Sequence, residues 1–124
     1  MVIPNQHETG RAHVVVLNWA NQDNVSVDLS GIGLQLNQRY EIHAVQDYYG
    51  AVTTNTYTGQ RAQVAMTNWT VAQPRSLTLA LSDTNWTAAH PSATPLPSTF
   101  PRFGAFVVTP IIVWRPPRNL RFVP

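Results

Sequence analysis

The sequence contains neither cysteine nor lysine, and it carries few charges of either sign. The absence of cysteine excludes disulfides, thiol nucleophiles and zinc sites built on thiolates. Charged residues make up 11% of the chain, against about 25% in an average soluble domain. The surface must therefore depend on uncharged polar side chains, chiefly Asn, Gln, Thr and Ser, for its contact with water.

Long hydrophobic runs are also missing. The longest apolar stretches, HVVVLNW and FVVTPIIVW, are shorter than the roughly 20 residues that span a bilayer as a helix. The first residues do not combine a basic segment with an apolar one, so we expect no signal peptide within this chain. The sequence therefore predicts no membrane partner.

The basic residues are unevenly distributed. All eight are arginines, and three of them, Arg115, Arg118 and Arg121, belong to the last ten residues, RPPRNLRFVP. The first 114 residues hold five arginines against six acids, a net charge of −1. Proteins that bind nucleic acid present a basic face on the folded body, because contacts to phosphate supply much of their affinity. The sequence therefore argues against a nucleic-acid partner.

What the chain does have is a series of short β-branched segments separated by turn residues. A length of 124 residues with 44% hydrophobic residues indicates one globular domain. Segments that recur at roughly 10-residue spacing are typical of an antiparallel β-sandwich. We expect an all-β fold of about seven or eight strands, immunoglobulin-like or similar to the C-terminal domain of amylases. The expected strands are 11–19, 25–29, 39–45, 51–57, 61–66, 76–81 and 103–109.

Residues 1–110 are expected to form this single domain, with a proline-rich loop at 82–103. Residues 111–124 would add a short apolar strand, IIVW, and the proline- and arginine-rich tail. The segment RAHVVVLNW is apolar on both faces, which predicts a central strand. VSVDL and RYEIHAV alternate apolar with polar positions, which predicts one inward face for each. The positions expected to face inward are Val25, Val27, Leu29, Tyr40, Ile42 and Ala44.

The stretch EIHAVQDYYGAV, residues 41–52, gathers an acid, two phenols and an imidazole. Asp47, Tyr48 and Tyr49, with His43 upstream, have the chemistry of a catalytic or sugar-binding site. Asp-Tyr-Tyr-Gly also has the composition of a type I turn, in which Asp47 bonds the backbone two residues on and Gly50 adopts a positive φ. We favour the turn, with the tyrosine rings lying over the end of the sheet.

No combination of residues points to catalysis. The six acids show no pairing that would supply a general acid and a general base. No nucleophile elbow, zinc-protease helix, phosphate loop or dinucleotide fingerprint occurs. His13 and His43 could meet across strands, but two histidines without a third ligand are weak grounds for a metal. The sequence therefore predicts no enzyme, no metal and no cofactor.

Aromatic rings are the remaining candidates for ligand contact, because an exposed ring stacks on a sugar as it does on a cation. Each of the four tryptophans also fits a packing role at the rim of the core. Trp19 and Trp86 are the better binding candidates, since both adjoin polar loops, NWANQDN and DTNWT. The candidate ligand-binding residues are Trp19, Asn21, Asp47, Tyr48, Tyr49 and Trp86.

Three segments, RAHVVVLNWANQDNVSVDLSG, RYEIHAVQDYYGAVTTNTYTG and FGAFVVTP, together resemble a C-terminal accessory β-sandwich module. Such modules follow catalytic or repeat domains in bacterial glycoside hydrolases and in large secreted bacterial proteins. The likeness covers about residues 11–110 and rests on a strand ending in Asn-Trp, a short valine-aspartate strand and an Asp-aromatic-Gly turn. The stretch RSLTLALSDTNWTAAH is longer than its counterpart, and the tail after Pro110 has none.

The resemblance implies a non-catalytic role, because in such families the active site belongs to the preceding domain. The expected function is accessory: the module packs on a neighbouring catalytic or repeat domain, or associates with itself as a homodimer. The alternative is a carbohydrate-binding module that takes a polysaccharide through exposed Trp, Tyr and amide side chains. The resemblance also favours an extracellular or periplasmic location.

Overall fold

The computed structural model describes residues 1–72 and 97–113. Within these ranges the protein is all-β, with seven strands, two single-turn 3-10 helices and antiparallel pairing throughout. The elements are β1 (Val2–Pro4), β2 (Ala12–Leu17), β3 (Asn24–Val27), η1 (Ser30–Ile32), β4 (Arg39–Ala44), η2 (Val45–Asp47), β5 (Val52–Thr56), β6 (Ala62–Ala65) and β7 (Phe103–Pro110). None of the helices in this part of the chain has the length and apolar character needed to cross a membrane.

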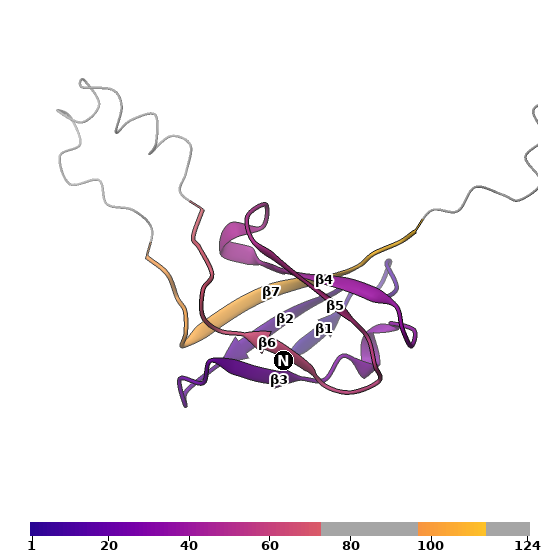
Figure 1. The fold of residues 1–124 in the computed structure, drawn as a ribbon, viewed down its shortest axis with the longest axis horizontal. Coiled ribbons are helices and arrows are strands. Elements are labelled where there is room, and N and C mark those ends of the chain that lie inside the picture. The colour runs from indigo at the N-terminus through magenta and orange to yellow at the C-terminus, as the bar shows by residue number, and fades with distance from the viewer. Residues whose placement is uncertain (73–96, 114–124) are drawn as a thin grey trace, which may run out of the picture.

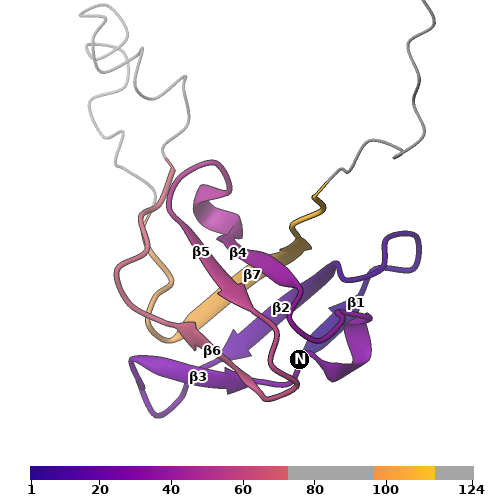
Figure 2. The ribbon, with the colours of Figure 1, turned by 45° about the vertical axis from the view of Figure 1, so that its right-hand side comes forward.

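The strands form two sheets, one of five strands in the order β1-β2-β7-β4-β5 and one made of β3 and β6 (Figure 1). β7, the last strand in the sequence, lies in the middle of the larger sheet, where it is orange between β2 and β4 (Figures 1 and 2). One register crosses the three strands, with Val14 opposite Phe106 and Phe106 opposite Ala44. The larger sheet is therefore completed only when β7 reaches strands encoded much earlier, which makes the topology strongly non-local.

Six of the seven predicted strands are confirmed, with ends that differ by one or two residues. The seventh, residues 76–81, lies outside the described residues, as does most of the predicted loop at 82–103. β1 was not predicted, because three residues are too few to show an alternation and Pro4 has no N–H for a strand ladder. β7 ends at Pro110, so the expected extension through IIVW is not found at residues 111–113, and Trp114 lies outside the described residues.

Both sheets contribute to one core, and the alternation predicted from the sequence places its residues. Val25 is half-buried, and the other five positions expected to face inward are at most 7% exposed, with Ala44 fully buried. Phe106 of β7 is also fully buried and packs between the sheets with Met66, which follows β6. Truncating such a residue to Ala would cost about 2–5 kcal/mol, through lost transfer free energy and a residual cavity.

Asn18 fixes the loop at the end of β2. Its side chain is buried and uses its full amide: Nδ2 donates to the carbonyl oxygens of Gln22 (2.7 Å) and Pro101 (2.9 Å), and Oδ1 accepts from the Gln22 N–H (3.0 Å). The backbone N–H of Asn18 also donates to the Arg102 carbonyl at 2.8 Å. This one residue therefore ties the loop between β2 and β3 to the segment that enters β7.

Candidate functional site

The larger sheet has a face that points away from the core, which we call the outer face. Strand alternation and the cross-strand register define it. Its residues are Ile3, His13, Val15, Leu17, Glu41, His43, Val52, Thr54, Phe103, Ala105, Val107 and Thr109. Along β2 and β7 these residues are mostly apolar, so the prediction that β2 is apolar on both sides and lies centrally in a sheet is confirmed.

Val107 lies at the middle of the outer face and is 6% exposed, although it does not belong to the core cluster between the sheets. Its direct cross-strand neighbours are His13 on β2 and His43 on β4. The two histidines therefore share a row but are separated by a whole strand, at two strand spacings of about 4.8 Å each. They do not meet, and the described residues contain no group of three or more metal-ligating side chains.

His43 is held by three contacts. Its Nδ1 lies 3.0 Å from the Tyr48 carbonyl oxygen, its Nε2 lies 3.1 Å from Oε2 of Glu41, and its ring stacks on the Tyr48 ring at 4.6 Å between centroids. Both ring nitrogens face oxygen acceptors, so the ring N–H of either tautomer has a partner. The histidine thus fixes the orientation of Tyr48 over the outer face.

Asp47 to Gly50 form a turn, with the Gly50 N–H donating to the Asp47 carbonyl oxygen at 3.1 Å. We predicted that this turn needs a glycine at position 50 in order to adopt a positive φ, but Gly50 does not adopt one. A Cβ on Gly50 would overlap Oδ2 of Asp47, so any side chain at this position would force the carboxylate to move. That carboxylate accepts a hydrogen bond from the Thr70 hydroxyl, a partner that the local sequence does not reveal.

The two tyrosines of the turn differ sharply. Tyr48 is half-buried on His43, as expected of a ring covering the sheet. Tyr49 is 97% exposed and touches only the edge of Tyr48, with ring centroids 5.1 Å apart. The expectation that both rings pack over the end of the sheet is therefore wrong for Tyr49.

The other candidate binding residues belong to a separate loop. Trp19 is 83% exposed and makes no ring contact with the described residues. Asn21 adopts a left-handed φ of 50° and donates its N–H to the Asn18 carbonyl at 3.1 Å. Trp86 lies outside the described residues. Within the described residues, no hydrogen bond or ring contact joins Trp19 or Asn21 to the Asp47–Tyr49 turn.

Trp69 illustrates the packing role that we expected of a tryptophan in this chain. Its Nε1 donates to the Ala65 carbonyl oxygen at 2.7 Å. Its ring lies 5.6 Å from that of Phe106 and 6.3 Å from that of Phe100, measured between centroids. The ring is therefore part of the rim of the core.

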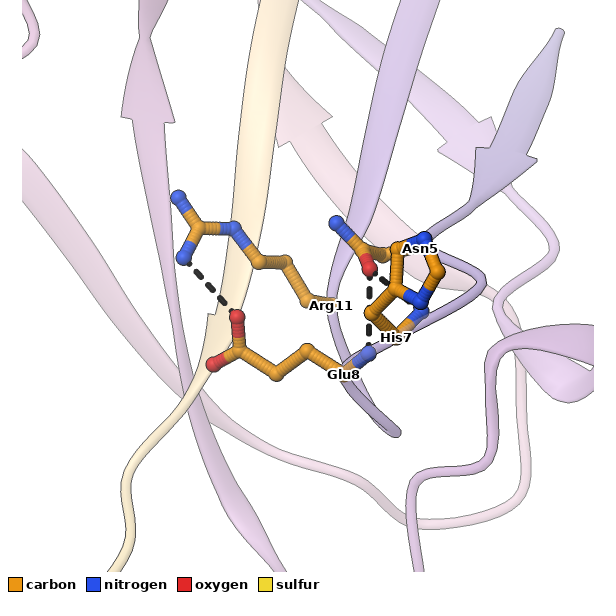
Figure 3. A network of polar contacts seen from close by, with 4 residues as sticks. All are labelled: Asn5, His7, Glu8 and Arg11. Carbon is orange, nitrogen blue, oxygen red and sulfur yellow. Dashed lines mark hydrogen bonds and ion pairs between the residues drawn. The ribbon is translucent and has the colours of Figure 1, made fainter.

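Contacts of Asn5 and an ion pair between Glu8 and Arg11 close the loop between β1 and β2 (Figure 3). The backbone N–H groups of His7 and Glu8 donate to Oδ1 of Asn5 at 2.8 and 3.0 Å, and Glu8 pairs with Arg11 at 2.9 Å. The hydrogen bond and charge of Glu8 raise the pKa of Arg11, with a small further contribution from Tyr48. Glu8 is thus engaged in loop structure, and Arg11 borders the outer face near Tyr48.

A polar pocket of about 200 Å³ is formed by residues of β4, β5, β6 and the β5–β6 connection. Its lining residues are Tyr40, Asn55, Thr56, Tyr57, Thr58, Gln60, Arg61, Ala62 and Gln63. Burial raises the pKa of Tyr40 above 10.0, against the opposing effect of a hydrogen bond from Asn55, so the phenol stays protonated near neutral pH. Sequence reasoning missed this pocket, because Tyr40 and Asn55 are brought together by the β4–β5 register.

Comparison with known proteins gives no relative: no family model matches the chain, and neither do any curated protein or solved structure.

Proposed function

We propose that the chain is a non-catalytic accessory module that docks through the outer face onto a neighbouring folded domain. The finer fold that we propose with it is a β-sandwich of the immunoglobulin-like or amylase C-terminal-like kind. The proposal takes its partner class from the resemblance to accessory modules of bacterial glycoside hydrolases and large secreted proteins, which also favours an extracellular or periplasmic location. It rests on the character of the outer face.

The observation that carries the proposal is the contrast between the outward surfaces of the two sheets. On the larger sheet, Leu17 (61% exposed) pairs directly with Phe103 (37% exposed), and Val15 pairs with Ala105. On the smaller sheet, the outward pairs are Ser26 with Gln63, both polar and exposed, and Asn24, also exposed, with the half-buried Ala65. Antiparallel sheets with one solvated face usually turn polar residues outward. An outward face with apolar pairs is a mark of an interaction surface.

The distribution of polar groups agrees with docking of a folded polypeptide. β2 and β7, which carry the apolar pairs, are inner strands of the sheet, and Leu17–Phe103 is the last pair at one end of them. Arg11 precedes β2 at its other end, and Glu41 and Tyr48 lie on the β4 side of β7. Charged and polar groups therefore adjoin the apolar surface, as they do at the rim of protein interfaces.

The proposal assigns no bond-making step to this chain. Three of its acids already have structural partners: Glu8 pairs with Arg11, Glu41 contacts His43, and Asp47 bonds Thr70. A general acid or base would have to leave these contacts in order to act.

The test is a pair of matched charge insertions, Leu17→Lys on the outer face and Ser26→Lys on the smaller sheet. A photo-crosslinking residue at position 17 or 26 identifies what each face touches when the chain is expressed in its natural setting. We expect position 17 to crosslink to one defined surface of a folded domain. Leu17→Lys should abolish co-purification with that domain, while Ser26→Lys leaves it intact. Equal behaviour of the two positions would reject docking through the outer face. Sedimentation of the purified chain over a concentration series tests whether the partner is a second copy of the chain. If a dimer forms, and Leu17→Lys dissociates it while Ser26→Lys does not, the outer face is the dimer interface.

A second candidate function is carbohydrate binding, which the exposure of Trp19 and Tyr49 favours. Rings in water lose hydration on stacking against a sugar, and the polarised ring face attracts the C–H groups. Titration with soluble polysaccharides should then quench the fluorescence of Trp19, and Trp19→Phe should remove the response. No change at millimolar repeat units, roughly the range of weak sites, would exclude this function.

A further inference from the structure

The β5–β6 pocket has a composition unlike that of the outer face. Eight of its nine lining residues carry a polar side-chain group, and they include three amides and the hydroxyls of two threonines. Ala62 is the exception. Each amide offers both a donor and an acceptor, and each hydroxyl offers the same pair of roles. A ligand rich in hydroxyl groups finds complementary partners throughout this lining.

Tyr57 is an aromatic residue in the lining of the pocket. It is half-buried against the core, and its backbone is fixed on both sides, with its N–H donating to Gln38 O and its carbonyl accepting from Asn37 N, both at 2.8 Å. The following turn contains Gly59 at φ +80°, a conformation that glycine adopts without strain. The ring position is therefore set before any ligand arrives, which lowers the entropy cost of binding.

Arg61 is the only charged residue in the lining. It forms no ion pair with the described residues. Its charge acts on the carboxylate of Asp28. The pKa of Asp28 is lowered mainly by hydrogen bonds from Ser30, with the charge of Arg61 the smallest contribution. The guanidinium thus remains available to an anion, and its planar donors match the two oxygens of a carboxylate.

We propose that the β5–β6 pocket binds a sugar acid, a hydroxylated ring that bears a carboxylate. The carboxylate pairs with Arg61, the ring stacks on Tyr57, and the hydroxyl groups bond the amides of Asn55 and Gln63. At about 200 Å³ the pocket is smaller than the roughly 300–1,000 Å³ that drug-sized ligands occupy, so it takes one ring at a time. The proposal does not rest on the docking function, and it uses neither Trp19 nor Tyr49.

The experiment is a titration of the isotope-labelled chain, followed by ¹H–¹⁵N correlation spectra, with three probes at constant ionic strength. D-glucuronate carries both the ring hydroxyls and the carboxylate, D-glucose lacks the carboxylate, and acetate lacks the ring. We expect shifts confined to residues 40 and 55–63, with glucuronate binding about tenfold or more tightly than either partial probe. That factor is the size of one charge-assisted contact.

Two arginine variants identify the contact. Arg61→Gln should reduce glucuronate affinity to that of glucose while leaving glucose unchanged. Arg102→Gln, which removes an exposed arginine outside the pocket, should change neither. Tyr57→Leu should weaken glucuronate and glucose together, with dispersion of the spectrum confirming that the fold is kept. The proposal is rejected if no shift appears by about 10 mM glucuronate, beyond the usual range of weak sites. It is also rejected if acetate binds as well as glucuronate, or if the two arginine variants behave alike.

Discussion

The side-chain amide of Asn18 donates to the carbonyl oxygen of Pro101 at 2.9 Å, across 83 positions of the sequence. The same nitrogen donates to Gln22, and the amide oxygen accepts from the Gln22 N–H. One buried side chain thereby connects a loop that carries the exposed Trp19 to the entry of the central strand β7. The loop conformation and the position of β7 depend on each other through this residue.

Asn18→Ala should lower the free energy of unfolding by about 2–3 kcal/mol, because the three hydrogen bonds that its buried amide makes to Gln22 and Pro101 are lost. Asn21→Gly is the matched control in the same loop. Because glycine adopts the left-handed backbone of position 21 without strain, the free energy of unfolding should change by no more than about 0.5 kcal/mol. Urea unfolding of both variants measures the difference. An Asn18→Ala cost as small as that of the control would show that Asn18 does not hold the loop to the entry of β7.

The predictable part of the fold is the part that local alternation specifies. Tyr40, Ile42 and Ala44 were expected on one face and are all buried, because a strand has a side-chain period of two. The alternation of apolar and polar residues along a strand does not show which face of the sheet is covered by another part of the protein. The segment RAHVVVLNW is apolar on both faces and forms an inner strand as predicted, yet Leu17 on its outer face is 61% exposed. Which side meets the second sheet depends on β3 and β6, and that is a tertiary property.

In the candidate site, too, some features follow from the local sequence and others only from the folded structure. Composition predicted the turn at Asp47, but the Thr70 partner lies 23 positions away and the crowding at Gly50 appears only in three dimensions. Asn55 gave no signal in the sequence, since it joins Tyr40 through the register of β4 and β5. Short-range patterns therefore identified the turn, whereas the pocket needed the assembled sheet.

Gly50→Ala should destabilise the protein by about 1–3 kcal/mol, the usual cost of forcing a methyl group into an occupied space. Most of that cost should disappear in an Asp47→Ala background, because the carboxylate oxygen that the added Cβ would overlap is then gone. A double-mutant cycle by urea unfolding measures the coupling. Additive costs would show that Gly50 is required for another reason, such as its backbone conformation.

Tyr48→Ala should cost about 1–2 kcal/mol, because it removes the ring stacked on His43 and part of the cover over the outer face. Tyr49→Ala should change stability by less than about 0.5 kcal/mol, as expected for a ring that is 97% exposed. Thermal unfolding at neutral pH compares the two variants. Similar losses for the neighbouring tyrosines would mean that Tyr49 packs in solution in a way that these contacts do not account for.

The burial of Tyr40 predicts how stability changes at alkaline pH. Its pKa is raised above 10.0 in the folded protein, chiefly by burial, so the folded state holds the phenol proton more tightly than the unfolded state. The stabilising contribution is complete below about pH 10, the pKa of an unfolded tyrosine. It is lost as the pH rises through the folded pKa, because the unfolded state then ionises first.

Tyr40→Phe removes this proton and should flatten the loss of stability above about pH 10. At pH 7 the variant should be about 1 kcal/mol less stable, because the bond from Asn55 is lost. The two unfolding curves should therefore approach each other as the pH rises. Tyr49→Phe is the control, since its ring is 97% exposed and the change should leave the free energy of unfolding at pH 7 unchanged. Parallel wild-type and Tyr40→Phe curves above pH 10 would show that the Tyr40 proton is not held more tightly in the folded state.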